Sequence, residues 1–215
     1  MKMRPVASGF LELPMRKAVN HLRTACPVMA GIIAKVGPCR LTYREADFHS
    51  LARSIVFQQL NGKAAATIFG RLTDAAKADP LTPEAILRVR LPKLRAAGLS
   101  AQKTSYIRDL AARTRSGEVD FARLPTLDDA GVIGHLTRVK GVGVWTAQMI
   151  LIFALKRADV LPTADYGIRA AMKRAYDLPD LPKPGQMEAL AEPWRPYRSV
   201  ACWYLWRLLD GPAEM

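Results

Sequence analysis

Apolar residues recur every three or four positions along most of the chain, which is the spacing of an amphipathic helix. Residues 44–60 show this spacing clearly: Phe48 and Ile55 fall on one side of a helix, and Asp47 stands where an N-cap is expected. The alanine-rich residues 62–77 continue the pattern. Two helices joined by a short turn are therefore predicted in this part of the chain.

Capping signals mark the ends of further helices. Thr82 precedes a proline in "TPEAILRV", and Ser100 precedes the periodic run "AQKTSYIRDLAARTR"; both are favoured N-cap residues. Gly98 closes the segment "LPKLRAAG" and suits a left-handed helix end. No segment alternates between apolar and polar residues over the length of a strand. The fold is therefore predicted to be all-α, with short helices and short connections.

The segment "LTRVKGVGVWTAQMIL", residues 136–151, interrupts an apolar helix with two glycines. We predict a helix that ends near Val139, a hairpin in which Gly141 and Gly143 adopt positive φ, and a second helix from Trp145. The new helix would present unpaired N–H groups and its positive end to a phosphate oxygen. An ordinary turn between two helices explains such glycines equally well.

The charge balance points to a polyanionic partner. Among the 215 residues, 32 are Lys or Arg and 19 are Asp or Glu, which gives a formal net charge of +13. The basic residues are spread along the chain, so they belong to a folded surface that attracts nucleic-acid phosphate. A ribosomal protein, a membrane-surface protein or a basic soluble enzyme has a similar balance. Arg138 and Lys140, just before the hairpin glycines, favour DNA as the partner.

The cysteines and the apolar runs argue against several classes of protein. Cys26, Cys39 and Cys202 lie far apart with no neighbouring histidine cluster, so neither a zinc site nor an iron–sulfur cluster is expected. The first residues lack the apolar core of a signal peptide, and the longest apolar run, residues 149–155, is too short to span a bilayer. We expect a cytoplasmic protein.

Four blocks of sequence together resemble the helix-hairpin-helix DNA glycosylase superfamily. They are "LTRVKGVGVWTA", "VLPTADYGIRAA", "IVFQQLNGKAAATIFGRL" and "AEPWRPYRSVACWYLWR". The last two are similar to the DNA-3-methyladenine glycosylase II branch, which acts on alkylated bases. The resemblance implies two helical subdomains that flank a DNA-binding cleft: residues 47–156, ending in the hairpin, and residues 1–46 with 157–215, carrying the catalytic aspartate. It also implies a short form without the N-terminal sheet domain of longer bacterial relatives.

The resemblance assigns roles to individual residues. Asp165, in "TADYG", falls on the catalytic aspartate of the family. Gln59 and Leu60 lie in the turn that plugs the gap in the duplex, and either of them is the wedge. The positions around the base pocket are Trp145, Tyr166, Trp206 and Phe57. The positions at the DNA-binding hairpin are Arg138, Lys140, Gly141, Gly143 and Thr146. The carbonyl groups that correspond to a site for Na⁺ or K⁺ are those of Val139 and Val142, and no other cofactor is expected.

These roles imply a monofunctional DNA glycosylase of base excision repair, acting as a monomer on double-stranded DNA and associated with a bacterial nucleoid. It would flip the damaged nucleotide out and hydrolyse the N-glycosidic bond of alkylated purines such as 3-methyladenine and 7-methylguanine. Alkylation makes the base a cation, which aromatic faces favour, and a good leaving group. Trp145 stands where the bifunctional lyases of the superfamily carry a lysine, so no Schiff base with the sugar is expected.

Three alternatives stay open at this point. The chain would be a non-catalytic helix-hairpin-helix DNA-binding module if Asp165 were only a helix N-cap. It would act on oxidised or deaminated bases if its pocket were built for them, although Trp145 in the lysine position disfavours a lyase. Tyr166 and Trp206 would be core residues if helix packing alone placed them.

Overall fold

The protein is described by a computed structural model that places residues 14–210. Every regular element in this part of the chain is a helix, which confirms the prediction of an all-α fold. None of the helices among these residues is long and apolar enough to cross a membrane. The elements are α1 (Met15–Ala25), α2 (Pro27–Val36), α3 (Phe48–Phe57), α4 (Gly62–Ala76), α5 (Pro83–Arg88), α6 (Leu91–Ala96), α7 (Ala101–Arg115), η1 (Phe121–Thr126), α8 (Asp129–Leu136), α9 (Val144–Phe153), α10 (Tyr166–Ala175), α11 (Pro184–Ala191), η2 (Glu192–Trp194) and α12 (Arg198–Asp210).

The predicted N-caps are present. The Asp47 carboxylate accepts the N–H of Ser50 at 2.8 Å, and the Thr82 hydroxyl accepts the N–H of Ala85 at 3.2 Å. Ser100 caps α7 in the same way. Each cap satisfies one of the N–H groups that a helix leaves unpaired in its first turn, which explains why these helices begin where the sequence predicts.

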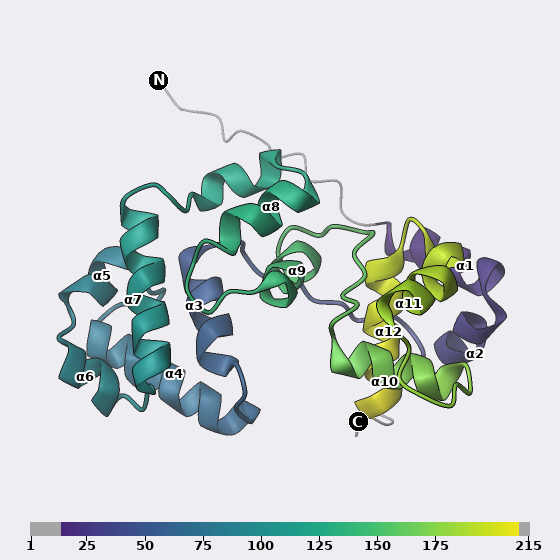
Figure 1. Ribbon diagram of the computed structural model, residues 1–215, viewed down its shortest axis with the longest axis horizontal. Coiled ribbons are helices and arrows are strands. Elements are labelled where there is room, and N and C mark those ends of the chain that lie inside the picture. Colours follow the sequence, from purple (N-terminus) through teal and green to yellow (C-terminus); the bar gives the residue numbers. More distant parts are fainter. Residues whose placement is uncertain (1–13, 211–215) are drawn as a thin grey trace. The chain divides into compact units, whose positions relative to one another are not determined.

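The chain divides into two compact units. Among the residues that the structure places, one unit contains residues 42–155 and the other combines residues 14–41 with residues 156–210. In the first unit, α7 packs against α3 and α5, and α8 packs against α9 (Figure 1). Fully buried Leu51, Ile55 and Leu110 contribute to the core of this unit.

The second unit brings the two ends of the chain together. In Figure 1 the purple helices α1 and α2 belong with the green and yellow helices α10 to α12, and both α1 and α2 contact α12. Trp194 and Tyr204 are the largest side chains buried completely in this core. The Tyr204 hydroxyl donates to the carbonyl of Gly37, at the end of α2, at 3.1 Å. The N-terminal helices therefore help to support α12.

Candidate functional site

The hairpin predicted between two helices lies between α8 and α9, with two differences from the prediction. The helix before it ends at Leu136 rather than near Val139, because the chain turns tightly twice: the N–H of Val139 bonds the carbonyl of Leu136, and the N–H of Val142 bonds that of Val139, both at 3.1 Å. The helix after it begins at Val144 rather than Trp145.

The prediction of positive φ holds for one hairpin glycine and is wrong for the other. Gly141 has φ 78°, and a Cβ at this position would overlap the ring of Tyr106 on α7. Gly143 has φ −94°, which any residue adopts, and a Cβ there would meet no atom within 4 Å. The fold therefore requires glycine at position 141. At Gly143 the missing side chain leaves the backbone open to a ligand.

The start of α9 has the features of an anion site. Its N-cap is Gly143, so no side chain caps the first turn. A helix of ten residues carries partial positive charge at this end. Val144 and Trp145, the first two residues of α9, are 53% and 42% exposed. The exposure of Trp145 rules out a core position for it and leaves it accessible to a ligand.

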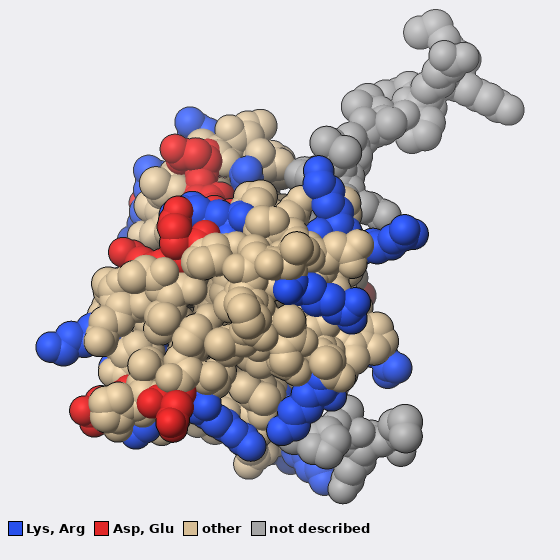
Figure 2. Space-filling view, turned by 90° about the vertical axis from the view of Figure 1, so that its right-hand side faces the viewer, with Lys and Arg blue, Asp and Glu red and all other residues tan. Residues whose placement is uncertain are grey.

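Basic side chains surround the hairpin and are also found elsewhere. Arg138 and Lys140 are exposed, although the Lys140 ammonium lies 4.0 Å from the carboxylate of Asp109, which offsets part of its charge. On the face shown in Figure 2, Lys and Arg side chains lie at several separate places along the edges, with fewer carboxylates. On this face the positive charge is therefore not gathered in a single patch, which agrees with its spread along the sequence.

The turn between α3 and α4 carries the predicted wedge residues. Gln59 is exposed and has φ 56°, which is uncommon for a residue other than glycine, and Leu60 is 40% exposed. The preceding residue, Gln58, donates its side-chain amide to the carbonyl of Gly141 at 3.0 Å and to the Thr146 hydroxyl at 3.4 Å. The turn and the hairpin are therefore joined directly within one unit.

Phe57, predicted at the base pocket, ends α3 and is half-buried. The guanidinium of Arg53 lies 3.9 Å from the centroid of its ring, and the ring of Phe69 lies edge-on at 6.5 Å. One face of Phe57 is thus already covered by a cation. Its place in a base pocket stays a prediction.

Asp165, the predicted catalytic residue, is the N-cap of α10. Its Oδ1 atom accepts the N–H of Ile168 at 2.7 Å and the indole N–H of Trp206 at 3.1 Å. The residue is buried, at 8% exposed. Two donors and the positive end of α10 hold this carboxylate in one orientation at the edge of solvent. The N-cap alternative is thus correct as a structural description, and it is compatible with a catalytic role.

The aromatic residues predicted beside Asp165 have different surroundings. Tyr166 is 71% exposed, so it is not a core residue. Trp206 is half-buried and packs against the core, and its indole also binds Asp165. A Cβ on Gly167 would lie 3.1 Å from the Asp165 carboxylate and 3.2 Å from Trp206, so a larger residue there would disturb this contact.

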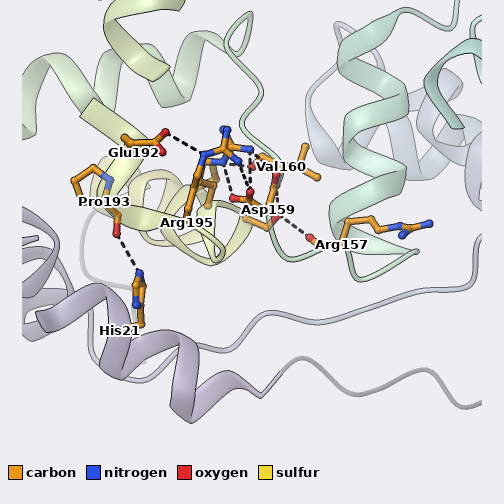
Figure 3. A network of polar contacts seen from close by, with 10 residues as sticks. His21, Arg157, Asp159, Val160, Glu192, Pro193 and Arg195 are labelled. Atoms are coloured by element: carbon orange, nitrogen blue, oxygen red, sulfur yellow. Dashed lines mark hydrogen bonds and ion pairs between the residues drawn. The ribbon is translucent and has the colours of Figure 1, made fainter. Parts of the chain in front are cut away.

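A cluster of ion pairs fixes the start of the loop that leads to Asp165. Arg198, in the first turn of α12, donates to the two carboxylate oxygens of Asp159 at 2.6 and 3.1 Å and to its backbone carbonyl at 2.9 Å. Arg195 donates to the same carboxylate at 2.7 Å (Figure 3). Because these hydrogen bonds join charged groups, they are among the stronger ones in a protein.

Ser199 holds the same loop through backbone groups. Its hydroxyl donates to the carbonyl of Arg157 at 2.7 Å and accepts the N–H of Val160 at 3.0 Å (Figure 3). Trp206, two turns further along α12, binds Asp165 itself. One helix therefore fixes both ends of the loop that carries the carboxylate.

Three residues that hold the turn and the loop in place, Gln58, Arg198 and Ser199, have no local signature in the sequence. Gln58 directly precedes Gln59 and Leu60, which the resemblance assigns to the wedge. Its own contacts with the hairpin do not follow from that assignment. Arg198 and Ser199 bind residues about forty positions earlier in the chain, and a basic residue on a helix is usually a solvated one. Only the folded chain shows these contacts.

Comparisons with known proteins agree with this geometry. Residues 52–196 match the family described as "HhH-GPD superfamily base excision DNA repair protein". DNA-3-methyladenine glycosylase 1 of Schizosaccharomyces pombe is 33% identical over 198 residues, covering 90% of this chain and 87% of the relative. A DNA-3-methyladenine glycosidase from Bacillus halodurans has a similar structure, with a TM-score of 0.78, 34% identity and coverage of 91% of this chain and 88% of that one. A 3-methyladenine DNA glycosylase from S. pombe in complex with abasic DNA is also similar, with a TM-score of 0.77, 34% identity and coverage of 88% and 95%.

Proposed function

Because the chain belongs to the HhH-GPD superfamily of base excision DNA repair proteins, we propose that it is a monofunctional DNA glycosylase that hydrolyses the N-glycosidic bond of alkylated purines. Relatives at about one-third identity over most of the chain carry the name DNA-3-methyladenine glycosylase, which supports this substrate class. We expect 3-methyladenine and 7-methylguanine among the bases it releases.

The orientation of the Asp165 carboxylate is the observation that carries the proposal. An alkylated purine is already cationic, so it leaves readily and needs little help from an acid. The sugar then develops positive charge, and a fixed negative charge beside it lowers the energy of the transition state. Asp165 supplies a fixed carboxylate for this role, because the N–H groups of Ile168 and Trp206 hold one of its oxygens. The same carboxylate can orient the water that completes hydrolysis.

Trp145 supports a monofunctional mechanism. A lyase needs an amine that attacks the sugar and forms a Schiff base. Trp145 occupies the position that the lysine of the bifunctional enzymes would hold, and an indole has no such nucleophile. Its ring is 42% exposed, and an aromatic ring is a suitable neighbour for a cationic base.

Double-stranded DNA is the proposed macromolecular partner, and we expect the protein to act as a monomer. The uncapped start of α9 and the open backbone at Gly143 suit a phosphate oxygen. Such contacts hold DNA without reading its sequence. A similar protein of S. pombe has been solved on abasic DNA, which supports this partner.

We further propose a Na⁺ or K⁺ ion at the carbonyl oxygens of Val139 and Val142. The Val139 carbonyl accepts the N–H of Val142 at 3.1 Å, and a carbonyl oxygen has a second lone pair for a cation. Such an ion would add positive charge beside the bound phosphate. Replacing Na⁺ and K⁺ by tetramethylammonium at constant ionic strength should then weaken DNA binding.

A base-release assay tests the function. Duplex DNA methylated with dimethyl sulfate is incubated with the protein, and the released bases are identified by mass spectrometry. Release of methylated purines, with no covalent adduct trapped by borohydride, is expected. DNA binding without release would favour the non-catalytic module. A borohydride-trapped adduct would favour a lyase.

A further inference from the structure

Lys103 makes two contacts that the proposed chemistry does not use. It lies in the first turn of α7, and its ammonium donates to the backbone carbonyls of Val56 at 2.7 Å and Gln58 at 2.6 Å. The side chain is half-buried, and burial lowers the pKa of its amine. An ammonium taken partly out of water loses hydration, so strong acceptors are needed to retain it there.

The two carbonyls belong to the end of α3 and to the turn that follows it. The last carbonyls of a helix have no partner within the helix and carry the negative end of its dipole. A lysine ammonium is a suitable donor for such groups. It binds the carbonyl just before Gln59, whose left-handed conformation costs on the order of 1 kcal/mol or more. Lys103 therefore binds the turn at the carbonyl that directly precedes its left-handed residue.

The same face of α7 supports the hairpin. Tyr106 lies three residues after Lys103, so the two side chains project from neighbouring positions on the helix. The ring of Tyr106 packs directly under Gly141. The side chain of Gln58 completes the connection, because its amide donates to the carbonyl of Gly141. The turn, the hairpin and α7 thus form one connected structure inside a single unit.

We propose that Lys103 is a positioning residue for duplex opening: it fixes the turn that carries Gln59 and Leu60 relative to the phosphate-binding hairpin. With the turn fixed, gripping the DNA backbone at the hairpin presents the wedge side chain at a set distance along the duplex. With the turn loose, the protein still binds phosphate, but the wedge side chain enters the space left by the flipped base less often. The inference rests on the proposed DNA glycosylase function and adds to it the group that aligns the wedge.

The test compares Lys103→Met, which keeps the length of the side chain and removes the charge and the donors, with the wild type. Lys93→Met, an exposed lysine on α6, is the matched control. Single-turnover release of 7-methylguanine is measured from a duplex and from the corresponding single strand, because a wedge matters only where a stack must be opened. DNA affinity and melting temperature are measured on the same preparations.

We expect Lys103→Met to lower release from the duplex by about tenfold more than release from the single strand, with duplex affinity within about twofold of the wild type. Lys103→Arg, which keeps the charge and the donors, should recover most of the difference. Equal losses on both substrates, or no loss, would overturn the proposal. If Lys103→Met does not fold, the test uses Gln58→Leu, which removes the hydrogen bond to Gly141. The same ratio, release from the duplex relative to release from the single strand, then supports or overturns the proposal.

A second measurement separates this proposal from the proposed function. Duplexes that contain 2-aminopurine become more fluorescent when the base leaves the stack, and this signal does not need bond cleavage. The wild type and Lys93→Met should raise the fluorescence, and Lys103→Met should raise it less at saturating protein. If no protein releases methylated bases but this difference is present, the glycosylase function fails while the role of Lys103 stands. Equal fluorescence from all three proteins would overturn that role.

Discussion

Replacing Asp165 with asparagine separates the charge of this side chain from its structural role. The oxygen that accepts the N–H of Ile168 and the indole N–H of Trp206 is retained in an amide. Asparagine is also as good an N-cap as aspartate. The substitution therefore keeps an acceptor for these two hydrogen bonds and removes the negative charge that would face the sugar.

The expected effects on stability and on rate differ greatly in size. Loss of the favourable interaction with the dipole of α10 costs about 0.3–1 kcal/mol of folding free energy. Two unit charges about 4 Å apart interact by about 4 kcal/mol at an effective dielectric constant near 20. Because about 1.4 kcal/mol corresponds to a tenfold change in rate, losing such an interaction in the transition state slows excision by about three orders of magnitude. The burial of Asp165, at 8% exposed, places it in surroundings where water screens the charge only in part.

The assay measures single-turnover release of methylated purines, duplex affinity and melting temperature on the same preparation. Asp47→Asn is the matched control, because Asp47 caps α3 through the same contact, to the N–H of Ser50 at 2.8 Å. Both variants should melt within a few degrees of the wild type. Only Asp165→Asn should lose excision, and its DNA affinity should be equal or higher, since a carboxylate near phosphate is repulsive.

Two results would refute this reasoning. If a folded, DNA-binding Asp165→Asn variant excised bases at nearly the wild-type rate, the negative charge of Asp165 would have no role in the mechanism. Unfolding of Asp165→Asn, with Asp47→Asn intact, would show that the charge is needed for the fold and would contradict the expectation that asparagine replaces Asp165 at little structural cost.

Further expectations concern the hairpin, the loop before Asp165 and the dependence of stability on pH. Gly143→Val adds a Cβ that meets no atom within 4 Å, but valine is a poorer N-cap than glycine, so the melting temperature should fall by only a few degrees. Duplex binding should weaken by about tenfold, the value of one charge-assisted hydrogen bond, and binding equal to wild type would contradict a phosphate contact there. Arg198→Met removes the donors to Asp159 and should lower the free energy of unfolding by about 2 kcal/mol in urea titrations, whereas an unchanged midpoint would show that the ion pair contributes nothing. Burial lowers the pKa of His135, whose ring nitrogen accepts the N–H of Asp120 at 2.8 Å. Below the ordinary pKa of 6.5 the folded state therefore binds fewer protons than the unfolded state, and the free energy of unfolding should fall as the pH drops through that range. The fall should be smaller in His135→Gln, as pH-dependent urea titrations would show.

Elements and caps could be predicted from the sequence because the contacts that define them are local. Asp47, Thr82, Ser100 and Asp165 each accept an N–H group three residues ahead, so the residue type and the periodic run after it are sufficient evidence. The same locality made Asp165 ambiguous. A helix cap and a catalytic carboxylate look alike in sequence. In the structure, Asp165 caps α10 and also accepts a hydrogen bond from the indole of Trp206.

The hairpin marks the point where local pattern is insufficient. Gly141 and Gly143 are equivalent in the sequence, and both were expected to have positive φ. The ring of Tyr106, from a different helix, lies under one of them and requires a glycine there, while the other has an ordinary backbone conformation. A packing partner far along the chain decides between the two, and no pattern within the hairpin reveals it.

Not every basic residue of this protein is evidence for DNA binding, because some of them bind groups of the protein itself. Lys103 and Arg198 add to the formal charge of +13, yet both donate to groups of the protein itself. Lys103 holds the end of α3, and Arg198 holds the loop before Asp165. A scan of basic residues that recorded only DNA affinity would pass over both, because their substitution should leave phosphate binding nearly intact. Measured by excision from duplex DNA, these two positions should rank above most exposed lysines and arginines, since each contacts a segment whose residues we propose to act on the substrate.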